Sequence, residues 1–272
     1  MQLPVNKFKQ AINSGRTQYG LWAGIPDSTS AEICAGSGFD WLLLDGEHAP
    51  FDMRAIYTYL QAVAAYDIHP IVRAVKGDRN LIKQLLDYGA QTLLIPMVDT
   101  REQAEALVSA MRYPPEGVRG MGSSIARAAR WNTIPDYVST ANTQTCLLIQ
   151  AETTMALENL PEILQVEGVD GVFIGPSDLS ASMGHVGNAG HPNVVAAIDE
   201  AITSIRQAGR AAGILALDPN QARHYIEVGA SFVGVGVDTI LLGNGARKLA
   251  ETFKGKADEE KSGEVKDIIS GY

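Results

Sequence analysis

Short runs of apolar residues alternate along this chain with longer amphipathic stretches. Most of the apolar runs are continuous rather than alternating, which is typical of strands buried on both faces. The stretches between them have the spacing of surface helices, and several end in glycine, a common stop signal. The predicted strands are residues 19–23, 40–45, 70–75, 92–98, 146–152, 171–175, 212–216 and 232–237, and the predicted helices are 28–38, 53–64, 79–89, 101–111, 154–166, 193–208 and 220–229.

This repeated order of helix, glycine and strand predicts an α/β fold, a (β/α)₈ TIM barrel rather than an open sheet. Residues 4–14 are expected to form an extra helix before the first strand. The long connection 113–145, which includes a helical 135–142, is of a length that is usually functional or a lid. We expect one barrel domain over residues 1–254 and a charged tail, 255–272, that frays.

Composition narrows the function classes. The chain has 272 residues, 46% of them hydrophobic, and a net charge of −9, which argues against nucleic-acid binding. No apolar run reaches the roughly 18–20 residues of a membrane span, and the first residues lack the pattern of a signal peptide. Cys34 and Cys146 are expected to be buried thiols of a cytoplasmic protein, and no zinc motif is present.

Carboxylates follow two successive predicted strands. Glu152 closes the fifth strand, and Asp178 follows the sixth. In a parallel barrel these strand exits lie side by side on the rim where such folds build their active sites. Two oxygen ligands with open positions suit Mg²⁺ or Mn²⁺, with substrate oxygens completing the shell. The alternatives are salt bridges or, for Asp178, the cap of a helix that starts at Leu179.

Other strand ends add polar groups to the same rim. Arg73, after the third strand, could hold a carboxylate or stabilise an enolate, or it could pair with Asp45 or Glu47. His48 follows Asp45-Gly-Glu and is a candidate general base. The amides at Ser177 and Asp178 could bind a substrate carboxylate at a helix start. Trp22, Asp45, Gln150, Gly175, Pro176 and Leu215 also end or follow strands.

Several motifs occur in the order of a known family. They are WLLLDGEHAP at 41–50, LIPMV at 94–98, YPPEGVRG at 113–120, QAET at 150–153 and VDGVFIGPSDLS at 169–180. With these motifs the chain resembles the HpcH/HpaI aldolase family from about residue 7 to residue 253. It departs from the family pattern at Ala151 and Ser177, where isoleucine and alanine are common, and Ser177 could change the polarity near a bound carboxylate.

The resemblance implies a metal-dependent pyruvate aldolase that uses Mg²⁺, Mn²⁺ or Co²⁺. The expected reaction is the reversible cleavage of a 4-hydroxy-2-oxo acid, such as 4-hydroxy-2-oxoheptane-1,7-dioate, to pyruvate and an aldehyde such as succinic semialdehyde. It also implies a homohexamer, a trimer of dimers with an exchanged C-terminal helix. Residue by residue, Glu152 and Asp178 match the metal ligands, Arg73 the arginine beside the keto oxygen, His48 the base and Asp87 its carboxylate partner. Trp22, Asp45, Gln150 and Leu215 match the pocket wall, and Gly175, Pro176, Ser177 and Asp178 match the carboxylate cradle.

Other functions stay open at this point. A Schiff-base aldolase would need a lysine, but no lysine lies within the eight predicted strands. Further alternatives are a 2-dehydro-3-deoxy-sugar-acid aldolase, an acyl-CoA lyase of the citrate-lyase-β type, and a barrel that binds without turnover. In the long connection, Arg119 or Arg127 could pair with a distal substrate carboxylate, across a subunit boundary, or form interface salt bridges.

Overall fold

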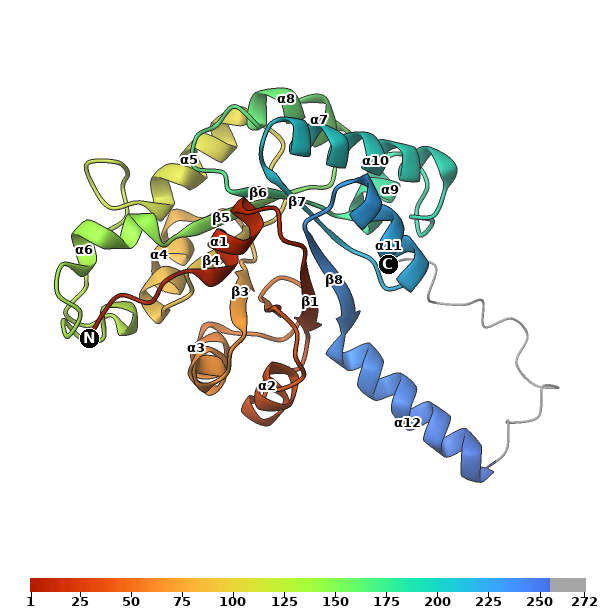
Figure 1. The fold of residues 1–272 in the computed structure, drawn as a ribbon, viewed down its shortest axis with the longest axis horizontal. Helices are drawn as coiled ribbons and strands as arrows, with labels where there is room; N and C mark the ends of the chain where they lie inside the picture. The colour runs from red at the N-terminus through yellow and green to blue at the C-terminus, as the bar shows by residue number, and fades with distance from the viewer. Residues whose placement is uncertain (255–272) are drawn as a thin grey trace.

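Eight parallel strands close into a barrel in which each strand pairs with its neighbours in chain order and β8 pairs with β1 (Figure 1). The computed structural model describes residues 1–254. All eight predicted strands are confirmed, with shifts of a few residues at their ends. They are β1 Gln18–Ala23, β2 Trp41–Asp45, β3 His69–Arg73, β4 Thr92–Ile95, β5 Cys146–Ala151, β6 Gly171–Ile174, β7 Ala211–Leu215 and β8 Phe232–Val237.

Helices follow the strands and surround the barrel. The predicted helix 154–166 is broken in two because Pro161 has no N–H to donate and Asn159 begins a new turn. The α-helices are α1 Lys7–Asn13, α2 Ser28–Ala35, α3 Met53–Ala62, α4 Arg79–Tyr88, α5 Arg101–Met111, α6 Tyr137–Thr140, α7 Thr154–Glu158, α8 Leu160–Ile163, α9 Pro176–Ser182, α10 Pro192–Gln207, α11 Pro219–Val228 and α12 Asp238–Lys254; the 3₁₀ turns are η1 Val63–Ala65, η2 Arg127–Ala129 and η3 Ala141–Thr143.

The glycines predicted to end helices do so in the left-handed region of backbone space. Gly38, Gly89, Gly168, Gly209 and Gly229 all have positive φ, between 74° and 132°. Side chains rarely adopt this conformation, whereas glycine does so without steric conflict. These positions therefore turn the chain back toward the next strand at the amino-terminal rim of the barrel.

Two apolar layers hold the barrel together. Inside it, Trp41, Leu43, Ile71, Leu148 and Phe173 belong to one buried cluster. Outside it, the opposite faces of the strands pack against the surrounding helices in a larger cluster. Strands buried on both faces explain why the sequence shows continuous apolar runs.

The N-terminal helix α1 closes the amino-terminal mouth of the barrel. Phe8 is 1% exposed and packs edge-on against Trp41 and Phe232, with ring centroids 6.4 and 5.7 Å away. Asn6 caps the helix and also donates from Nδ2 to Thr92 Oγ1 at 3.0 Å. The extra N-terminal helix is therefore confirmed, and it plugs the end of the barrel opposite to the strand exits.

His69 lies within this plug and gives a pH prediction. Its ring stacks on Phe8, its Nε2 is 2.7 Å from Thr92 Oγ1, and burial lowers its pKa from 6.5 to about 3. Between pH 6.5 and 3 the unfolded chain therefore binds a proton at this site that the folded chain does not. This contribution makes the protein less stable as the pH falls through that window, by at most about 1.4 kcal/mol per pH unit.

We expect His69→Gln to reduce the loss of stability between pH 7 and pH 5. Urea unfolding midpoints at both pH values measure this, with His224→Gln on the surface of α11 as the control. Equal pH dependence in the wild type and in His69→Gln would contradict this account.

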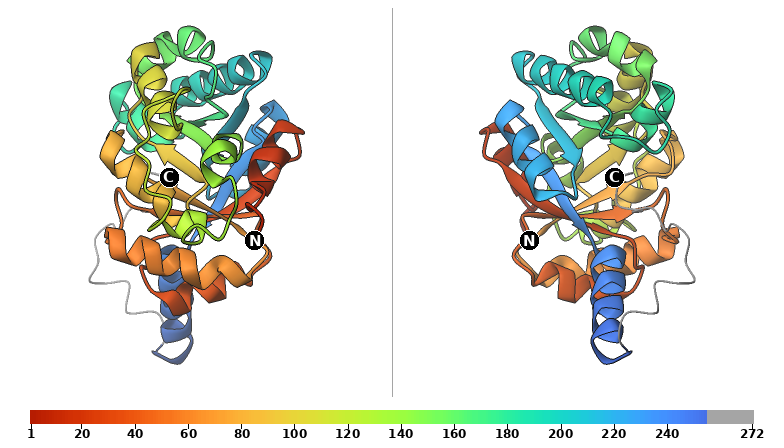
Figure 2. Two further views of the ribbon diagram at one scale, coloured as in Figure 1. Left: turned by 90° about the vertical axis from the view of Figure 1, so that its left-hand side faces the viewer. Right: turned by 90° about the vertical axis from the view of Figure 1, so that its right-hand side faces the viewer.

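Helix α12 leaves the barrel after β8 and extends away from it (Figures 1 and 2). Asp238 is its one buried residue, and Leu241, Leu242, Leu249 and Phe253 are between 57% and 82% exposed. The predicted tail, 255–272, lies outside the described residues. Within residues 1–254, no helix has the length and apolar character needed to cross a bilayer.

Candidate active site

Asp45 and Arg73 form the centre of one half of the site. They are register partners at the ends of β2 and β3, so their side chains meet at the carboxyl rim. Arg73 donates from Nε to Asp45 Oδ1 at 2.9 Å and from Nη2 to Asp45 Oδ2, and Trp22 Nε1 donates to Oδ2 at 3.0 Å. Burial opposes ionisation of Asp45, but hydrogen bonds and charge from Arg73 outweigh it, and the pKa of Asp45 lies below its usual value.

The loop after β2 adds two side chains to this group. The amides of Glu47 and His48 donate to Asp45 Oδ1 at 3.0 and 3.1 Å, which fixes the loop against the strand end. Glu47 Oε2 lies 3.0 Å from Arg73 Nη1 and 3.7 Å from His48 Nε2. Burial raises the pKa of Glu47 despite its contact with Arg73. The side chain of His48 is 67% exposed and so remains open to a substrate.

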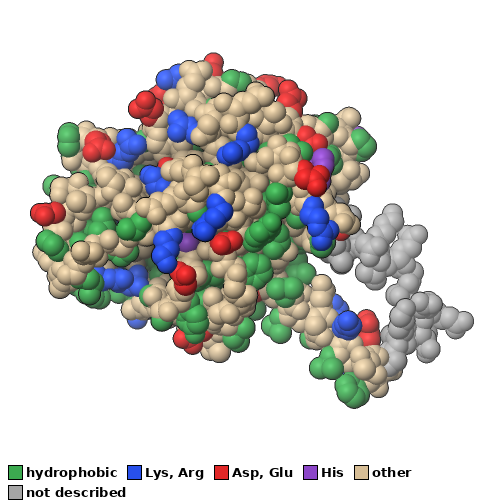
Figure 3. Space-filling model, in the orientation of Figure 1, with side chains coloured by type: hydrophobic (Ala, Val, Ile, Leu, Met, Phe, Trp, Pro, Cys, Tyr) green, Lys and Arg blue, Asp and Glu red, His purple; other side chains and the backbone are tan. Residues whose placement is uncertain are grey.

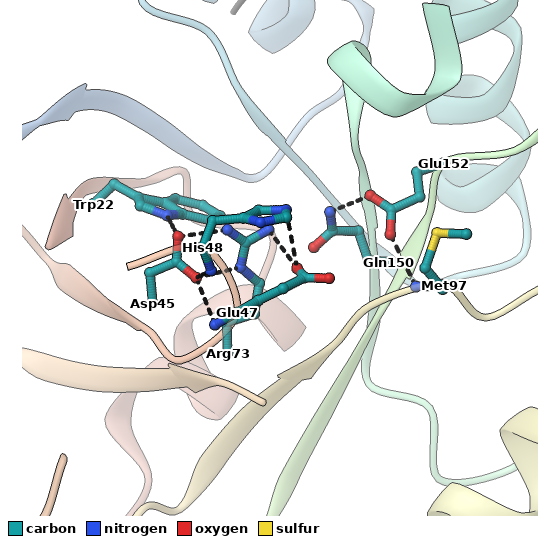
Figure 4. Close-up of polar contacts among 8 residues, drawn as sticks. All are labelled: Trp22, Asp45, Glu47, His48, Arg73, Met97, Gln150 and Glu152. Carbon is teal, nitrogen blue, oxygen red and sulfur yellow. Dashed lines mark hydrogen bonds and ion pairs between the residues drawn. The ribbon is translucent and has the colours of Figure 1, made fainter. Parts of the chain in front are cut away.

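Glu152 forms the centre of the other half. It is 2% exposed, its Oε1 accepts from the Met97 amide at 2.9 Å, and its Oε2 accepts a short hydrogen bond from Gln150 Nε2. Figure 4 shows this group facing the Asp45 and Arg73 group, with the carboxylate of Glu47 directed between them. The two halves come from β1–β3 and from β4–β5, and they meet across the mouth of the barrel.

Negative charge accumulates around Glu152. Burial, together with the charges of Asp178 and Glu47, raises its pKa to about 7 against the two hydrogen bonds. Asp178 lies in the first turn of α9, where Gly175 and not Asp178 takes the cap position. The capping alternative for Asp178 is therefore wrong, because the helix starts at Pro176 rather than at Leu179.

These groups fit a divalent cation. Glu152 and Asp178 are hard oxygen donors on adjacent strand exits, and a cation between them would offset the burial and the like charges that raise the pKa of Glu152. Gln150 Oε1 is a buried acceptor without a hydrogen-bond partner in the described structure. Two carboxylate ligands would leave coordination positions for substrate oxygens.

Gly175 packs directly against Glu152. A Cβ at this position would lie 2.9 Å from Glu152 Cβ and 3.0 Å from Gln150 Nε2, closer than side chains tolerate. We expect Gly175→Ala to displace Glu152 and to weaken metal binding by about 10–100-fold, the range for losing a group that orients a ligand. Calorimetric titration with Mn²⁺ measures this, with Gly190→Ala as a control, because a Cβ there would make only an ordinary contact, 3.9 Å from Asn188 Oδ1. Unchanged affinity would show that the close packing does not position the carboxylate.

The structure does not bring Asp87 to His48. Asp87 is near the end of α4, at the amino-terminal rim, and its Oδ1 accepts from Arg119 Nη2 at 2.7 Å. His48 follows the carboxyl end of β2, at the opposite rim. The connection that holds Arg119 and Arg127 runs from α5 to β5 and therefore also lies at the amino-terminal rim. Within one chain, none of these three residues can reach the site.

The remaining predicted residues lie at the carboxyl rim. Leu215 ends β7, and Gly175, Pro176 and Ser177 lead from β6 into α9. The sequence offered Glu47 as one possible ion-pair partner of Arg73, which the structure confirms, but it gave no sign of the Met97 amide. Met97 has φ 56°, an unusual conformation for a residue with a side chain, and this turn aims its N–H at Glu152. The Pro96-Met97 dipeptide at a strand exit was the available signal.

Comparison with known proteins gives the class of enzyme. The family model described as HpcH/HpaI aldolase/citrate lyase matches residues 18–245. The chain therefore belongs to this family and is an aldolase, a carbon–carbon lyase, as the motifs predicted.

Individual relatives cover nearly the whole chain. A hydroxypyruvate/pyruvate aldolase of Pseudomonas aeruginosa is 60% identical over 94% of this chain and 96% of its own. A 4-hydroxy-2-oxo-heptane-1,7-dioate aldolase of Klebsiella pneumoniae is 58% identical over 91% and 94%. The crystal structure of a family protein from Burkholderia cenocepacia has a TM-score of 0.89 at 36% identity and covers 92% of this chain and 100% of its own.

Proposed function

We propose that this protein is a divalent-metal-dependent pyruvate aldolase that reversibly cleaves 4-hydroxy-2-oxo acids to pyruvate and an aldehyde. The observation that carries the proposal is the arrangement of two halves across the mouth of the barrel. The cation Arg73 is held by Asp45 and Glu47 on one side, and the carboxylate of Glu152 lies on the other, with Asp178 near it. A 2-oxo acid bound between the two halves would place its keto and carboxylate oxygens between two positive charges. Arg73 would supply one, and a metal held by Glu152 and Asp178 would supply the other.

Glu152 and Asp178 would hold the metal, which can be Mg²⁺, Mn²⁺ or Co²⁺. When bound, the metal polarises the 2-oxo group as a Lewis acid. Gln150 orients Glu152 through its amide, as does the Met97 N–H. The first turn of α9, which contains Ser177 and Asp178, lies at the positive end of the helix dipole and is suited to the substrate carboxylate.

Arg73 would stabilise the charge that develops during cleavage. The C3–C4 bond breaks and its electron pair moves toward the 2-oxo oxygen. The guanidinium has five N–H donors, and Asp45 and Glu47 use three of them. One N–H on each Nη therefore remains for substrate oxygen, while Trp22 supports the guanidinium from 4.9 Å.

His48 would act as the general base that removes the 4-hydroxyl proton in cleavage. Its exposed ring borders the site, with Nε2 3.7 Å from Glu47 Oε2. We expect His48→Ala to lower kcat by about 10²–10⁴-fold with little change in metal affinity. Steady-state kinetics and metal titration check this, with His185→Ala in the loop after α9 as the control. Near-full activity of His48→Ala would remove the base from this scheme.

Asp87 would serve the site of another copy of the chain. It cannot reach His48 of its own chain, and the exposed leucines of α12 offer an apolar face for a second barrel. We therefore include in the proposal a homo-oligomer, a hexamer with exchanged C-terminal helices, in which Asp87 orients a neighbouring His48. Mixing inactive His48→Ala and Asp87→Asn chains should then restore part of the activity, because some sites receive both native residues.

Two substrate classes follow from the relatives. A 4-hydroxy-2-oxoheptane-1,7-dioate substrate would yield succinic semialdehyde, whereas the relatives at 60% identity are named for hydroxypyruvate as well as pyruvate. A panel of aldehydes, each with pyruvate and with hydroxypyruvate, separates them. Each reaction is run with EDTA and with Mg²⁺, Mn²⁺ or Co²⁺. Activity that resists EDTA, or borohydride trapping of a pyruvate adduct, would contradict the metal-dependent proposal.

A further inference from the structure

A second cavity lies at the amino-terminal rim, on the far side of the barrel from the active site. It has a volume of about 630 Å³, within the range of small-molecule sites. Its lining includes Gln18 at the start of β1, His69 at the start of β3 and Thr145 just before β5, together with the segment that leads into α1. No residue that we place in the active site of this chain lines it.

The lining is cationic in a protein that is acidic overall. Five of the 22 Lys and Arg residues line the cavity, but only two of the 31 Asp and Glu residues do, which gives a net lining charge of +3 in a chain of net charge −9. Figure 3 shows Lys and Arg side chains gathered around α1 on this face. The five cations are Lys7, Arg16, Arg119, Arg127 and Arg130, and the two carboxylates are Asp40 and Asp67.

Both carboxylates already have partners. Asp67 pairs with Lys7 at 2.6 Å, and Asp40 accepts from the Tyr19 amide at 2.9 Å. In the described part of the chain, Arg16, Arg127 and Arg130 have no carboxylate within ion-pair distance. The cavity therefore holds three guanidinium groups whose charge is not balanced by a neighbouring acid.

Of these three arginines, Arg127 is the one whose unbalanced charge is buried. The residue is 8% exposed, and its guanidinium donates to the carbonyls of Tyr88 and Leu60 at 2.8 and 3.1 Å. Gly89 makes room for it, because a Cβ there would lie 2.7 Å from Nη1. A buried charge whose hydrogen bonds go only to neutral carbonyls, with the cation Arg130 nearby, is unfavourable unless an anion pairs with it.

The neighbouring arginines have further features of a binding site. Arg119 is 1% exposed, and its Nε is a buried donor without a hydrogen-bond partner in the described structure. Arg130, Trp131 and Asn132 have φ values of 48°, 53° and 65°, three consecutive side-chain-bearing residues in the left-handed region. Such strain persists where the surroundings impose it, and it often marks functional sites. Arg130, the first of the three, lines the cavity.

We propose that this cavity binds a small oxyanion, phosphate or a short dicarboxylate, between Arg16, Arg127 and Arg130. The bound anion would balance the buried charge of Arg127 and join α1 to the connection between α5 and β5. Planar guanidinium groups recognise both kinds of oxyanion through paired N–H donors. Within one chain this site lies on the far side of the barrel from the aldolase centre, and its existence does not depend on the proposed reaction.

Titration calorimetry on the full chain tests the proposal, with inorganic phosphate in one series and succinate in another. EDTA is present throughout, so that the active site cannot bind either anion through a metal. We expect saturable binding of at least one anion to the wild type. In the double variant Arg16→Gln/Arg130→Gln, binding should be at least about tenfold weaker, since each lost pair removes charge-assisted hydrogen bonds.

Three controls make the outcome decisive. Arg223→Gln, on the surface of α11, should bind like the wild type, and so should Glu152→Gln in the active site. The bound anion should also raise the unfolding temperature of the wild type more than that of the double variant. Binding of phosphate alone or of succinate alone would identify the kind of anion. Absence of saturable binding, or equal affinity in the double variant, would overturn the proposal.

Discussion

Replacing Glu152 with glutamine is expected to raise the dissociation constant for Mn²⁺ by more than about 10²-fold and to lower turnover at least as much. Loss of a group that only orients a metal ligand costs about 10–100-fold, and Glu152 would be a ligand itself. Glutamine has a similar shape and can still accept from the Met97 amide, but it removes the negative charge. It also sets a second amide against Gln150, whose Nε2 now donates to the carboxylate.

The stability of the metal-free protein distinguishes a loss of metal binding from misfolding of the variant. Burial already raises the pKa of Glu152 to about 7. In the absence of metal, the ionised carboxylate is therefore less favourable in the folded chain than in the unfolded chain. Glu152→Gln should therefore leave the urea unfolding midpoint of the apo protein unchanged or higher at pH 8. Metal titration and cleavage assays measure the functional loss, with Glu158→Gln on the exposed side of α7 as the control. Metal affinity that stays near the wild-type value would exclude Glu152 as a ligand.

Replacing Arg73 with lysine is expected to lower kcat by about 10²–10³-fold while metal affinity changes little. An ammonium group keeps the charge but cannot bind both oxygens of Asp45, reach Glu47 and still donate to the substrate. The loss should appear mainly in kcat, because negative charge at the 2-oxo oxygen develops during cleavage. Steady-state kinetics at saturating metal measure it, with Arg101→Lys, from a surface pair with Glu105, as the control.

Arg73→Ala should in addition be unstable. It leaves Asp45 and Glu47 without the cation between them, and breaking a buried pair in this way costs about 3–5 kcal/mol. Arg73→Lys should keep most of that stability, so the pair of variants separates catalysis from folding. A lysine variant with wild-type kcat would show that the guanidinium has a structural role only.

Much of the active site was predictable because parallel strands deliver their last residues to one rim. The apolar runs located Glu152 and Asp178 at neighbouring exits, and they placed Arg73 beside Asp45. The sequence offered Asp45 or Glu47 as the partner of Arg73; that both hold it was not predictable, because the direction of the Glu47 side chain depends on the loop that the Asp45 carboxylate fixes. The Met97 amide was hidden for a similar reason, since its contact with Glu152 arises from an unusual backbone turn.

The sequence by itself determined the barrel, its strand order and the glycines that end its helices, because these depend on local periodicity and local backbone preference. It also determined the class of enzyme through motifs that occur in a fixed order. Only the tertiary structure decided that Asp87 faces the opposite rim from His48. Only the tertiary structure gathered Arg16, Arg127 and Arg130 around one cavity. Arg16 is far along the chain from Arg127 and Arg130, and packing between distant segments, which no local pattern encodes, brings it to the same cavity.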